Sequence, residues 1–292
     1  MAALGFLGLS ARAGPAHAAE ASAWVEGAHS RARLIDAGLA ASGARPTGTA
    51  PFGATLLLAG IEIRLAPHFI TYWRDPGDAG VPPTFDFGGS TNLAAAEVRY
   101  PAPEMLDEAG AKAFGYEGDV VFPVIVTPAD PAKPVRLSLH VDYAACHDVC
   151  LPARAVLTGV LDAQTSVETG RVRDALAAVP RPDTVGGTGG SVRILAVRPD
   201  RDGFSVEAEV GDGQGTLFVE APEGWVYEAG AAVPAPPTGT APTGAGAVMF
   251  PVKLLDRPEG TGVPHGPVVL TLVAPAGAIE VPVQLDGGAL KR

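Results

Sequence analysis

The property of this sequence that most constrains its fold is an alternation of apolar and polar residues in short runs. The clearest run covers residues 135–143, where every second residue is apolar and the residues between them are polar. A period of two places the apolar side chains on one face of a β-strand. Turn clusters such as Asp75-Pro76-Gly77-Asp78 separate such runs along the chain, as expected between strands. The pattern predicts an all-β protein.

The amino-acid content agrees with this interpretation. The 37 glycines and 28 prolines make up more than a fifth of the 292 residues, which is typical of many short strands joined by tight turns. Apolar residues account for 47% of the chain, too many for a disordered protein. A chain of this length is long enough for two domains of ordinary size. We therefore expect two immunoglobulin-like β-sandwich domains joined by a short helical linker.

The predicted domains follow from where the alternating runs stop and resume. Residues 20–162 carry the first set of runs and are expected to form the first sandwich. A capping-box pattern at residues 165–168 precedes a helical run at 170–179, which Pro180 and Pro182 end, so residues 163–190 are predicted to be the linker. Strand-like runs resume in residues 191–288, the expected second sandwich, at 192–198, 204–210, 216–220, 248–255, 268–273 and 279–285.

Three further expectations concern the connections in the second half. The glycine-rich run 211–215 stands between two of these strands and is predicted to be a hairpin turn. Residues 229–246, rich in alanine, proline, glycine and threonine, are predicted to be a long loop. If the second sandwich is autonomous, proteolysis near residues 181–190 is expected to release two folded halves, with redox activity in the first.

The N-terminus and the net charge limit where the protein works and what it binds. Residues 1–19 hold a short apolar run followed by Ala16-His17-Ala18, a small-x-small pattern typical of signal-peptidase cleavage, although a basic n-region is missing. No other uncharged apolar run reaches the roughly 18 residues that span a bilayer. We therefore expect an exported, soluble periplasmic protein. The net charge of −11 and the lack of basic runs argue against nucleic-acid binding.

The chemistry of the chain centres on its only two cysteines, Cys146 and Cys150, within the stretch DYAACHDVCLPAR. Alternating residues on both sides predict a β-hairpin with His147-Asp148-Val149 as its loop, which places the cysteines opposite each other within disulfide range. A bridge closing so short a loop stabilises a protein by only about 2 kcal/mol. Neighbouring thiols are also competent for exchange, because one can resolve a mixed disulfide formed by the other. The spacing therefore favours a redox pair over a structural bridge, without excluding the latter.

A metal site is the other alternative. Cys-x-x-x-Cys followed closely by proline also resembles the motif of SCO-type copper chaperones, in which two thiolates and a histidine suit Cu(I). The candidate third ligands are His147, which lies nearest, His140 and His68. The chain lacks the alternating strand-helix pattern of those chaperones. It also lacks a zinc spacing such as HExxH, a G-x-S-x-G elbow and a phosphate loop, so no cofactor is expected.

Three stretches in the same order resemble a known family. Residues 66–82 include Tyr72-Trp73 and Pro76-Gly77-Asp78, residues 114–124 begin with Phe114-Gly-Tyr116, and residues 142–152 hold the cysteine pair. Together they resemble the periplasmic N-terminal domain of the thiol:disulfide interchange protein DsbD. The cysteine spacing and the second β domain resemble the copper-tolerance relatives called ScsB. Those proteins continue into membrane and thioredoxin-like domains, so the resemblance implies separately encoded partners or a longer protein.

The resemblance implies a function and a set of roles. Cys146 and Cys150 would cycle between dithiol and disulfide, relaying electrons from a membrane-embedded thiol donor to periplasmic thioredoxin-fold proteins, as a component of a protein-disulfide reductase. Cys150 would form the mixed disulfide and Cys146 would resolve it. Phe114 and Tyr116 would belong to a cap over the pair. Two supporting residues complete the predicted site: Tyr72, packed under the pair, and His147, beside Cys146. Cu(I) binding through Cys146, Cys150 and His147 is the alternative function.

Overall fold

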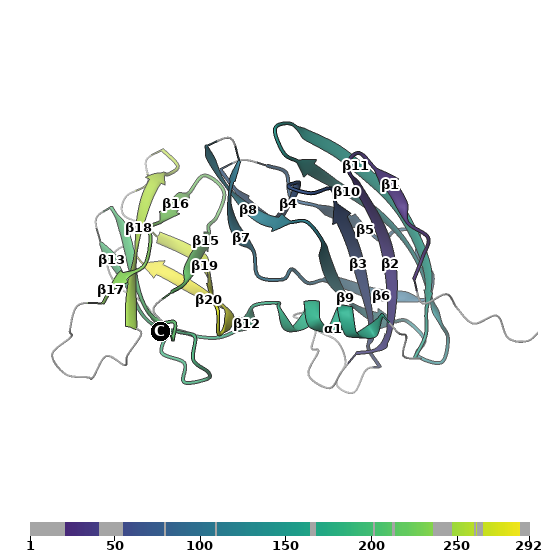
Figure 1. The fold of residues 1–292 in the computed structure, drawn as a ribbon. Coiled ribbons are helices and arrows are strands. Elements are labelled where there is room, and N and C mark those ends of the chain that lie inside the picture. Colours follow the sequence, from purple (N-terminus) through teal and green to yellow (C-terminus); the bar gives the residue numbers. More distant parts are fainter. Residues whose placement is uncertain are drawn as a thin grey trace, which may run out of the picture.

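The computed structural model describes residues 21–40, 55–78, 80–108, 110–163, 168–200, 202–211, 214–235, 247–259, 261 and 265–286. They form two β-sandwiches that lie side by side, with a short helix running along the base of the first sandwich toward the second (Figure 1). The fold is therefore all-β and immunoglobulin-like, as the alternation predicts. The predicted signal peptide, residues 1–19, lies outside the described residues.

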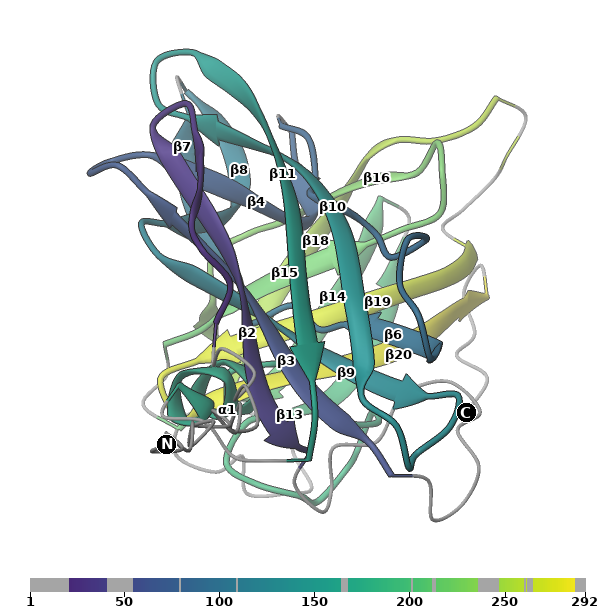
Figure 2. The same ribbon diagram turned by 90° about the vertical axis from the view of Figure 1, so that its right-hand side faces the viewer.

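The N-terminal sandwich packs two antiparallel sheets face to face. One sheet has the order β1-β2-β3-β9-β6, and the other has the order β11-β10-β4-β8-β7 with β5 paired to β10. Inward-facing apolar residues of both sheets form one core. Figure 2 shows β10 and β11 as a long hairpin beside β2. The strands are β1 Val25–Gly27, β2 Ser30–Leu39, β3 Leu57–Leu65, β4 Ile70–Gly77, β5 Thr84–Asp86, β6 Leu93–Val98, β7 Glu104–Glu108, β8 Ala111–Glu117, β9 Val120–Pro128, β10 Val135–Cys146 and β11 Cys150–Leu161.

The C-terminal sandwich has a separate core between two smaller sheets, β12-β20-β19-β15 and β13-β14-β18-β16, with β17 paired to β18. All six strands predicted for this half are present. Their bounds, with those of three short strands that were not predicted, are β12 Arg181–Pro182, β13 Arg193–Asp200, β14 Gly203–Glu209, β15 Thr216–Glu220, β16 Val226–Ala229, β17 Val233–Pro234, β18 Ala247–Asp256, β19 His265–Ala274 and β20 Gly277–Asp286.

Two predicted connections in this half need correction. The prediction of a hairpin turn at residues 211–215 is wrong, because β14 and β15 belong to different sheets and the chain crosses the sandwich between them. A glycine-rich turn marks a change of direction but does not determine which strand pairs with which. The predicted loop at residues 229–246 also begins too early, because Ala229 still belongs to β16 and Val233–Pro234 form β17. Residues 236–246 lie outside the described part of the chain.

The predicted helical run is present as α1, Thr169–Ala177, with Glu168 as its N-cap residue. The rest of the capping box, residues 165–167, lies outside the described residues, and Glu168 makes no side-chain capping hydrogen bond. The helix is held on the N-terminal sandwich. Val172 is fully buried against Gly60, and Arg171 donates to the buried carboxylate of Glu62 at 2.5 Å. Among the described residues, no helix is long and apolar enough to cross a membrane.

The two sandwiches share an interface built on β4 and β8. Phe218 of β15 is 1% exposed and packs within the core of the N-terminal sandwich, where its ring lies 5.8 Å from the ring of Trp73 and 4.9 Å from that of Phe114. Arg74 donates to Glu220 at 2.6 and 2.9 Å and also pairs with Glu280. The C-terminal sandwich therefore completes the packing around one sheet of its neighbour.

Candidate functional site

The predicted hairpin is formed by β10 and β11. Cys146 ends β10, Cys150 begins β11, and the two residues are register partners with Cα atoms 4.0 Å apart. They form a disulfide. The connecting loop consists of residues 147–149, as the alternation predicts. The bridge therefore joins the two strands at the tip of a hairpin, where it closes a small loop and adds little to the packing of the sandwich.

The two sulfurs differ in access. Cys146 is completely buried, in a small apolar cluster with Tyr72, Ala113 and Ala144. Cys150 is exposed. A large reactant therefore reaches Sγ of Cys150 more easily than Sγ of Cys146, and this asymmetry arises from the packing of β10 against the neighbouring strand β4.

The pairing register determines which side chains face the disulfide. Cys146 lies opposite Ile70, and Tyr72 lies opposite Gly115 two positions along, so Cys146, Ile70 and Tyr72 share one face of the sheet. In the β7–β8 pair, Leu106 lies opposite Ala113 and Glu108 opposite Ala111, which puts both on that same face. The side chains of the site thus come from the β10–β11 hairpin, from β4 and from β7, which are distant in sequence.

Tyr72 is the central polar group of the site. Its side chain is fully buried, and its hydroxyl lies 2.9 Å from Sγ of Cys146 and 3.1 Å from Sγ of Cys150. The same hydroxyl donates to Oε2 of Glu108 at 2.7 Å. Burial first, and then the neighbouring Glu108 carboxylate, raise the pKa of Tyr72 well above its ordinary value. The hydroxyl therefore keeps its hydrogen at neutral pH and can donate it.

Glu108 is the group that the sequence reasoning missed. It ends β7, is half-buried, and places Oε1 3.0 Å from Sγ of Cys150. The segment around it, Met105-Leu106-Asp107-Glu108, shows no motif, because its proximity to the sulfurs depends on the pairing of β7 with β8 and of β8 with β4. The only signal in the sequence is that Glu108 lies six residues before Phe114, where the predicted cap segment begins.

A glycine allows the chain to pass directly over Tyr72. Gly80 has a φ of +110°, and a Cβ at this position would lie 2.3 to 2.5 Å from atoms of the Tyr72 ring. Only a residue without a side chain fits this conformation and this contact. Gly80, which belongs to the segment that carries part of the family resemblance, therefore has a structural role beside the tyrosine ring.

The predicted cap residues lie on the other face of β8. The ring of Phe114 packs edge-on against Phe218, and Tyr116 is buried with its hydroxyl donating to the carbonyl of Pro101 at 2.8 Å. Within the described residues, neither side chain belongs to the apolar cluster that surrounds Cys146. The groups that do cover the disulfide from this hairpin are Leu106 and Glu108. The two-residue period of β8 explains the difference, since Phe114 and Tyr116 alternate with Ala113 and Gly115.

The histidines proposed for Cu(I) are directed elsewhere. His147 packs its ring 5.5 Å from the ring of Phe69 and pairs with Asp148, Nδ1 to Oδ2, at 3.1 Å. His68 is exposed and lies 3.5 Å from Glu117, while His140 is exposed further along β10. Among the described residues, the ligating group gathered with the two sulfurs is the carboxylate of Glu108. A hard oxygen ligand suits Cu(I) poorly, so nothing in this arrangement favours a copper site.

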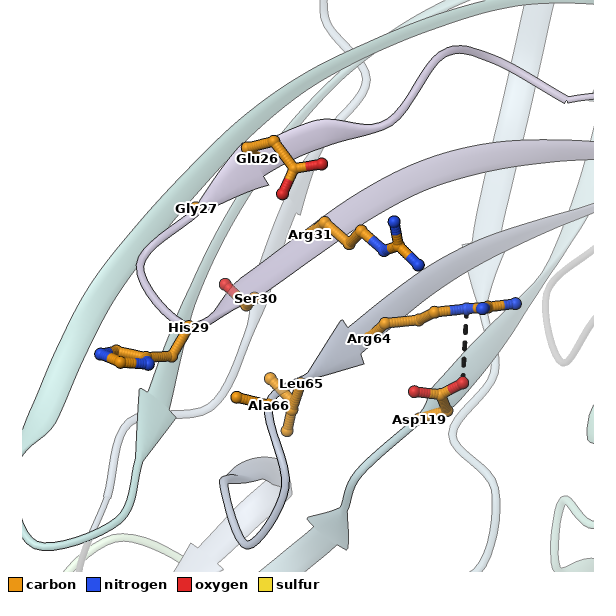
Figure 3. Close-up of a pocket in the computed structure, with 9 residues that line it drawn as sticks. All are labelled: Glu26, Gly27, His29, Ser30, Arg31, Arg64, Leu65, Ala66 and Asp119. Atoms are coloured by element: carbon orange, nitrogen blue, oxygen red, sulfur yellow. Dashed lines mark ion pairs between the residues drawn. The ribbon is translucent and has the colours of Figure 1, made fainter.

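A separate pocket of about 510 Å³ lies at one end of β1, β2 and β3 (Figure 3). It contains two arginines, Arg31 and Arg64, and two acids, Glu26 and Asp119; Arg64 pairs with Asp119 at 3.3 Å. The opposite charges offset each other. The other two reactive side chains of the pocket are engaged in contacts of their own, since the Ser30 hydroxyl lies 2.9 Å from the Tyr143 hydroxyl and the His29 ring stacks on Phe69. The chemistry of the described residues therefore resides at the disulfide.

Comparisons with known proteins agree with this location. Residues 53–162 match the family model described as "Thiol:disulfide interchange protein DsbD, N-terminal". The match begins after β1 and β2, although both belong to the same sheet as β3, with β1 paired to β2 and β2 paired to β3. The crystal structure of the N-terminal periplasmic domain of ScsB from Proteus mirabilis is similar, with a TM-score of 0.64 and 20% sequence identity, over 92% of this chain and 99% of that chain. No curated protein sequence matches the chain. The structural likeness shows a shared fold that includes both sandwiches.

Proposed function

Because residues 53–162 form a DsbD N-terminal-like domain with a disulfide at its edge, we propose that this protein is a periplasmic thiol-disulfide exchange protein. It passes electrons from a membrane-embedded thiol donor to periplasmic thioredoxin-fold proteins. The observation that carries the proposal is the asymmetry of the pair. A disulfide with one exposed and one buried sulfur, both next to the hydroxyl of Tyr72, is arranged for attack at one defined atom.

Reduction begins when a thiolate of the donor attacks Sγ of Cys150, the exposed sulfur. A bond forms between the donor sulfur and Cys150, and the Cys146–Cys150 bond breaks, so that Cys146 leaves with the electron pair as a thiolate. The Tyr72 hydroxyl, 2.9 Å away, carries a single hydrogen, which turns from Oε2 of Glu108 to this thiolate as the charge develops. A hydrogen bond to an ionised acceptor is stronger than one to the neutral disulfide sulfur. Tyr72 thus stabilises the charge that develops during the step.

The second half of the reduction releases the donor. The second thiol of the donor attacks its own sulfur in the mixed disulfide, which leaves the donor oxidised and frees Cys150 as a thiolate. The two protons from the two donor thiols complete the Cys146/Cys150 dithiol. Glu108, with one carboxylate oxygen 3.0 Å from Sγ of Cys150 and the other on Tyr72, is placed to pass a proton to or from the exposed sulfur.

Electron delivery follows the same route in reverse. The Cys150 thiolate attacks the disulfide of a thioredoxin-fold partner and forms a mixed disulfide, and one partner sulfur leaves as a thiolate. Cys146 then attacks Sγ of Cys150, which restores the internal disulfide and releases the reduced partner. Val149, 68% exposed beside Cys150, offers the partner an apolar contact at the point of attack.

The test is a pair of cysteine variants. Each is mixed with a thioredoxin-fold protein that retains only its exposed cysteine, activated as a mixed disulfide with thionitrobenzoate. Cys146→Ala is expected to release thionitrobenzoate and to form a covalent complex that a reductant dissociates, whereas Cys150→Ala is expected to form little. A stronger complex from Cys150→Ala would reverse the two roles. If neither variant forms a complex and the reduction potential of the wild-type pair lies below about −300 mV, the bridge is structural and the proposal is wrong.

A further inference from the structure

The β7–β8 hairpin has two faces with different contacts. On one face, Leu106 and Glu108 lie against the disulfide and Tyr72. On the other face, Phe114 packs edge-on against Phe218, and Lys112 pairs with Glu228 at 2.5 Å. Both of these contacts cross to the C-terminal sandwich. The hairpin is therefore held between the redox disulfide and the second domain, and Figure 1 shows β7 and β8 on the side that faces β15 and β16.

A second set of contacts fixes the C-terminal sandwich relative to the redox site. Arg74 of β4, two residues after Tyr72, pairs with Glu220 and Glu280, and its guanidinium lies 4.6 Å from the centre of the Trp73 ring. Burial by itself lowers the pKa of Arg74, but the two carboxylates outweigh burial and raise the pKa, so the guanidinium stays charged. The strand that carries Tyr72 and the hairpin that carries Glu108 thus contact the same neighbouring domain.

We propose that the C-terminal sandwich positions the cover of the redox site, with Phe218 and Glu228 holding the β7–β8 hairpin so that Glu108 stays over Sγ of Cys150. Phe114 and Lys112 are the hairpin's own positioning residues. The inference rests on the proposed function for its biological meaning, and it assigns a role to the second domain. Phe114, predicted to shield the disulfide directly, acts instead from the opposite face of the strand.

The physical consequence concerns access to the exposed sulfur. A carboxylate 3.0 Å from Sγ of Cys150 occupies part of the approach to this atom and repels an incoming thiolate. A cover that is held only by its own strand pairing at the edge of a sheet opens more often than one that is also held from behind, because edge elements lie at the low end of local stability. Loss of the contacts behind the hairpin therefore makes the disulfide react faster with a small thiol.

The experiment measures the rate at which dithiothreitol reduces the disulfide of the full chain, together with hydrogen exchange of the β7–β8 amides. Phe114→Ala is expected to raise both, with reduction about tenfold faster, equivalent to an opening free energy lower by about 1.4 kcal/mol. Phe85→Ala is the matched control. It removes a partly buried ring from the same core, on β5, without touching the hairpin. It is expected to lower stability while leaving the reduction rate unchanged.

Two further variants keep the proposal falsifiable if Phe114→Ala does not fold. Glu228→Gln removes the negative charge that pairs with Lys112 at a half-buried position and is expected to give a smaller increase in the same rate. Its control is Glu209→Gln, which removes an ion pair with Arg193 inside the C-terminal sandwich. The proposal would be overturned if folded Phe114→Ala and Glu228→Gln were both reduced at the wild-type rate. It would also be overturned if the two control variants showed equal increases in the reduction rate. Dithiothreitol needs no protein partner, so this result is independent of whether the relay exists.

Discussion

Replacing Tyr72 by phenylalanine tests the central step of the proposed chemistry. The substitution removes only the hydroxyl, which lies 2.9 Å from Sγ of Cys146, 3.1 Å from Sγ of Cys150 and 2.7 Å from Glu108. The ring that packs beneath Gly80 is kept. We expect slower reduction of the disulfide by a small thiol, because the departing Cys146 thiolate loses its hydrogen-bond donor.

The magnitude follows from the strength of that bond. A hydrogen bond to a charged acceptor contributes about 1.5–3 kcal/mol. About half of the charge is on the leaving sulfur in the transition state of thiol exchange, if the Brønsted coefficient of roughly 0.4–0.5 also applies to the leaving group. The barrier therefore rises by roughly 0.8–1.5 kcal/mol, and the rate falls about 4- to 13-fold. Because the pKa of Tyr72 is raised, the hydroxyl stays protonated and the effect is expected to persist into mildly alkaline solution.

The assay is the rate of disulfide reduction by excess dithiothreitol, quenched with an alkylating reagent and read by mass. Tyr116→Phe is the matched control, since it removes a buried tyrosine hydroxyl that donates to a backbone carbonyl on the other face of the sheet. It should cost about 1 kcal/mol of stability without slowing reduction. The Tyr72 variant is also measured in a Glu108→Ala background, where the slowing is expected to be at least as large, because Glu108 no longer competes for the hydrogen of the Tyr72 hydroxyl. A Tyr72→Phe rate within twofold of wild type, or equal slowing in the control, would refute the reasoning.

Two other predictions follow from single residues. Gly80→Ala places a Cβ 2.3 Å from the Tyr72 ring at a φ of +110°, so the variant is expected to lose about 1–3 kcal/mol of stability in thermal unfolding; an unchanged midpoint would show that the loop moves aside freely. Asp36 is buried, and this burial raises its pKa from 3.8 to about 6, so the wild-type protein loses stability as pH rises through that range. In Asp36→Asn the side-chain oxygen can still accept a hydrogen bond from the Gly38 amide. In urea unfolding, this variant is expected to be more stable than the wild type at pH 7 but not near pH 4. An equal difference in stability at the two pH values would contradict this prediction.

Several features of the fold could be predicted because they depend on local pattern. A two-residue alternation specifies a strand and its buried face, and residues 135–143 and the six runs of the second half all proved to be strands. The hairpin with residues 147–149 at its tip followed from alternation on both sides of the cysteines, and pairing across so short a loop leaves one register. The resemblance to the DsbD N-terminal domain likewise rests on contiguous stretches of sequence.

The parts that could not be predicted depend on contacts between distant strands. The hairpin assigned to residues 211–215 was wrong because an alternating strand pairs equally well in either sheet of a sandwich, and only the packing of the complete domain selects one. The predicted cap residues Phe114 and Tyr116 lie on the core face of β8, since the register of β8 against β4 decides which half of its side chains meets the disulfide.

The amino-acid sequence by itself determined that the chain is made of strands, that Cys146 and Cys150 face each other at a hairpin tip, and that their chemistry is that of sulfur. These properties depend on the period of the side chains and on a separation of four residues. Only the tertiary structure decided that Cys146 is buried while Cys150 is exposed, that the Tyr72 hydroxyl lies against both sulfurs and Glu108 against that of Cys150, and that Phe218 of the second sandwich packs against Phe114. Such contacts join residues tens of positions apart, and their geometry is set by strand order and register, which a local pattern does not encode.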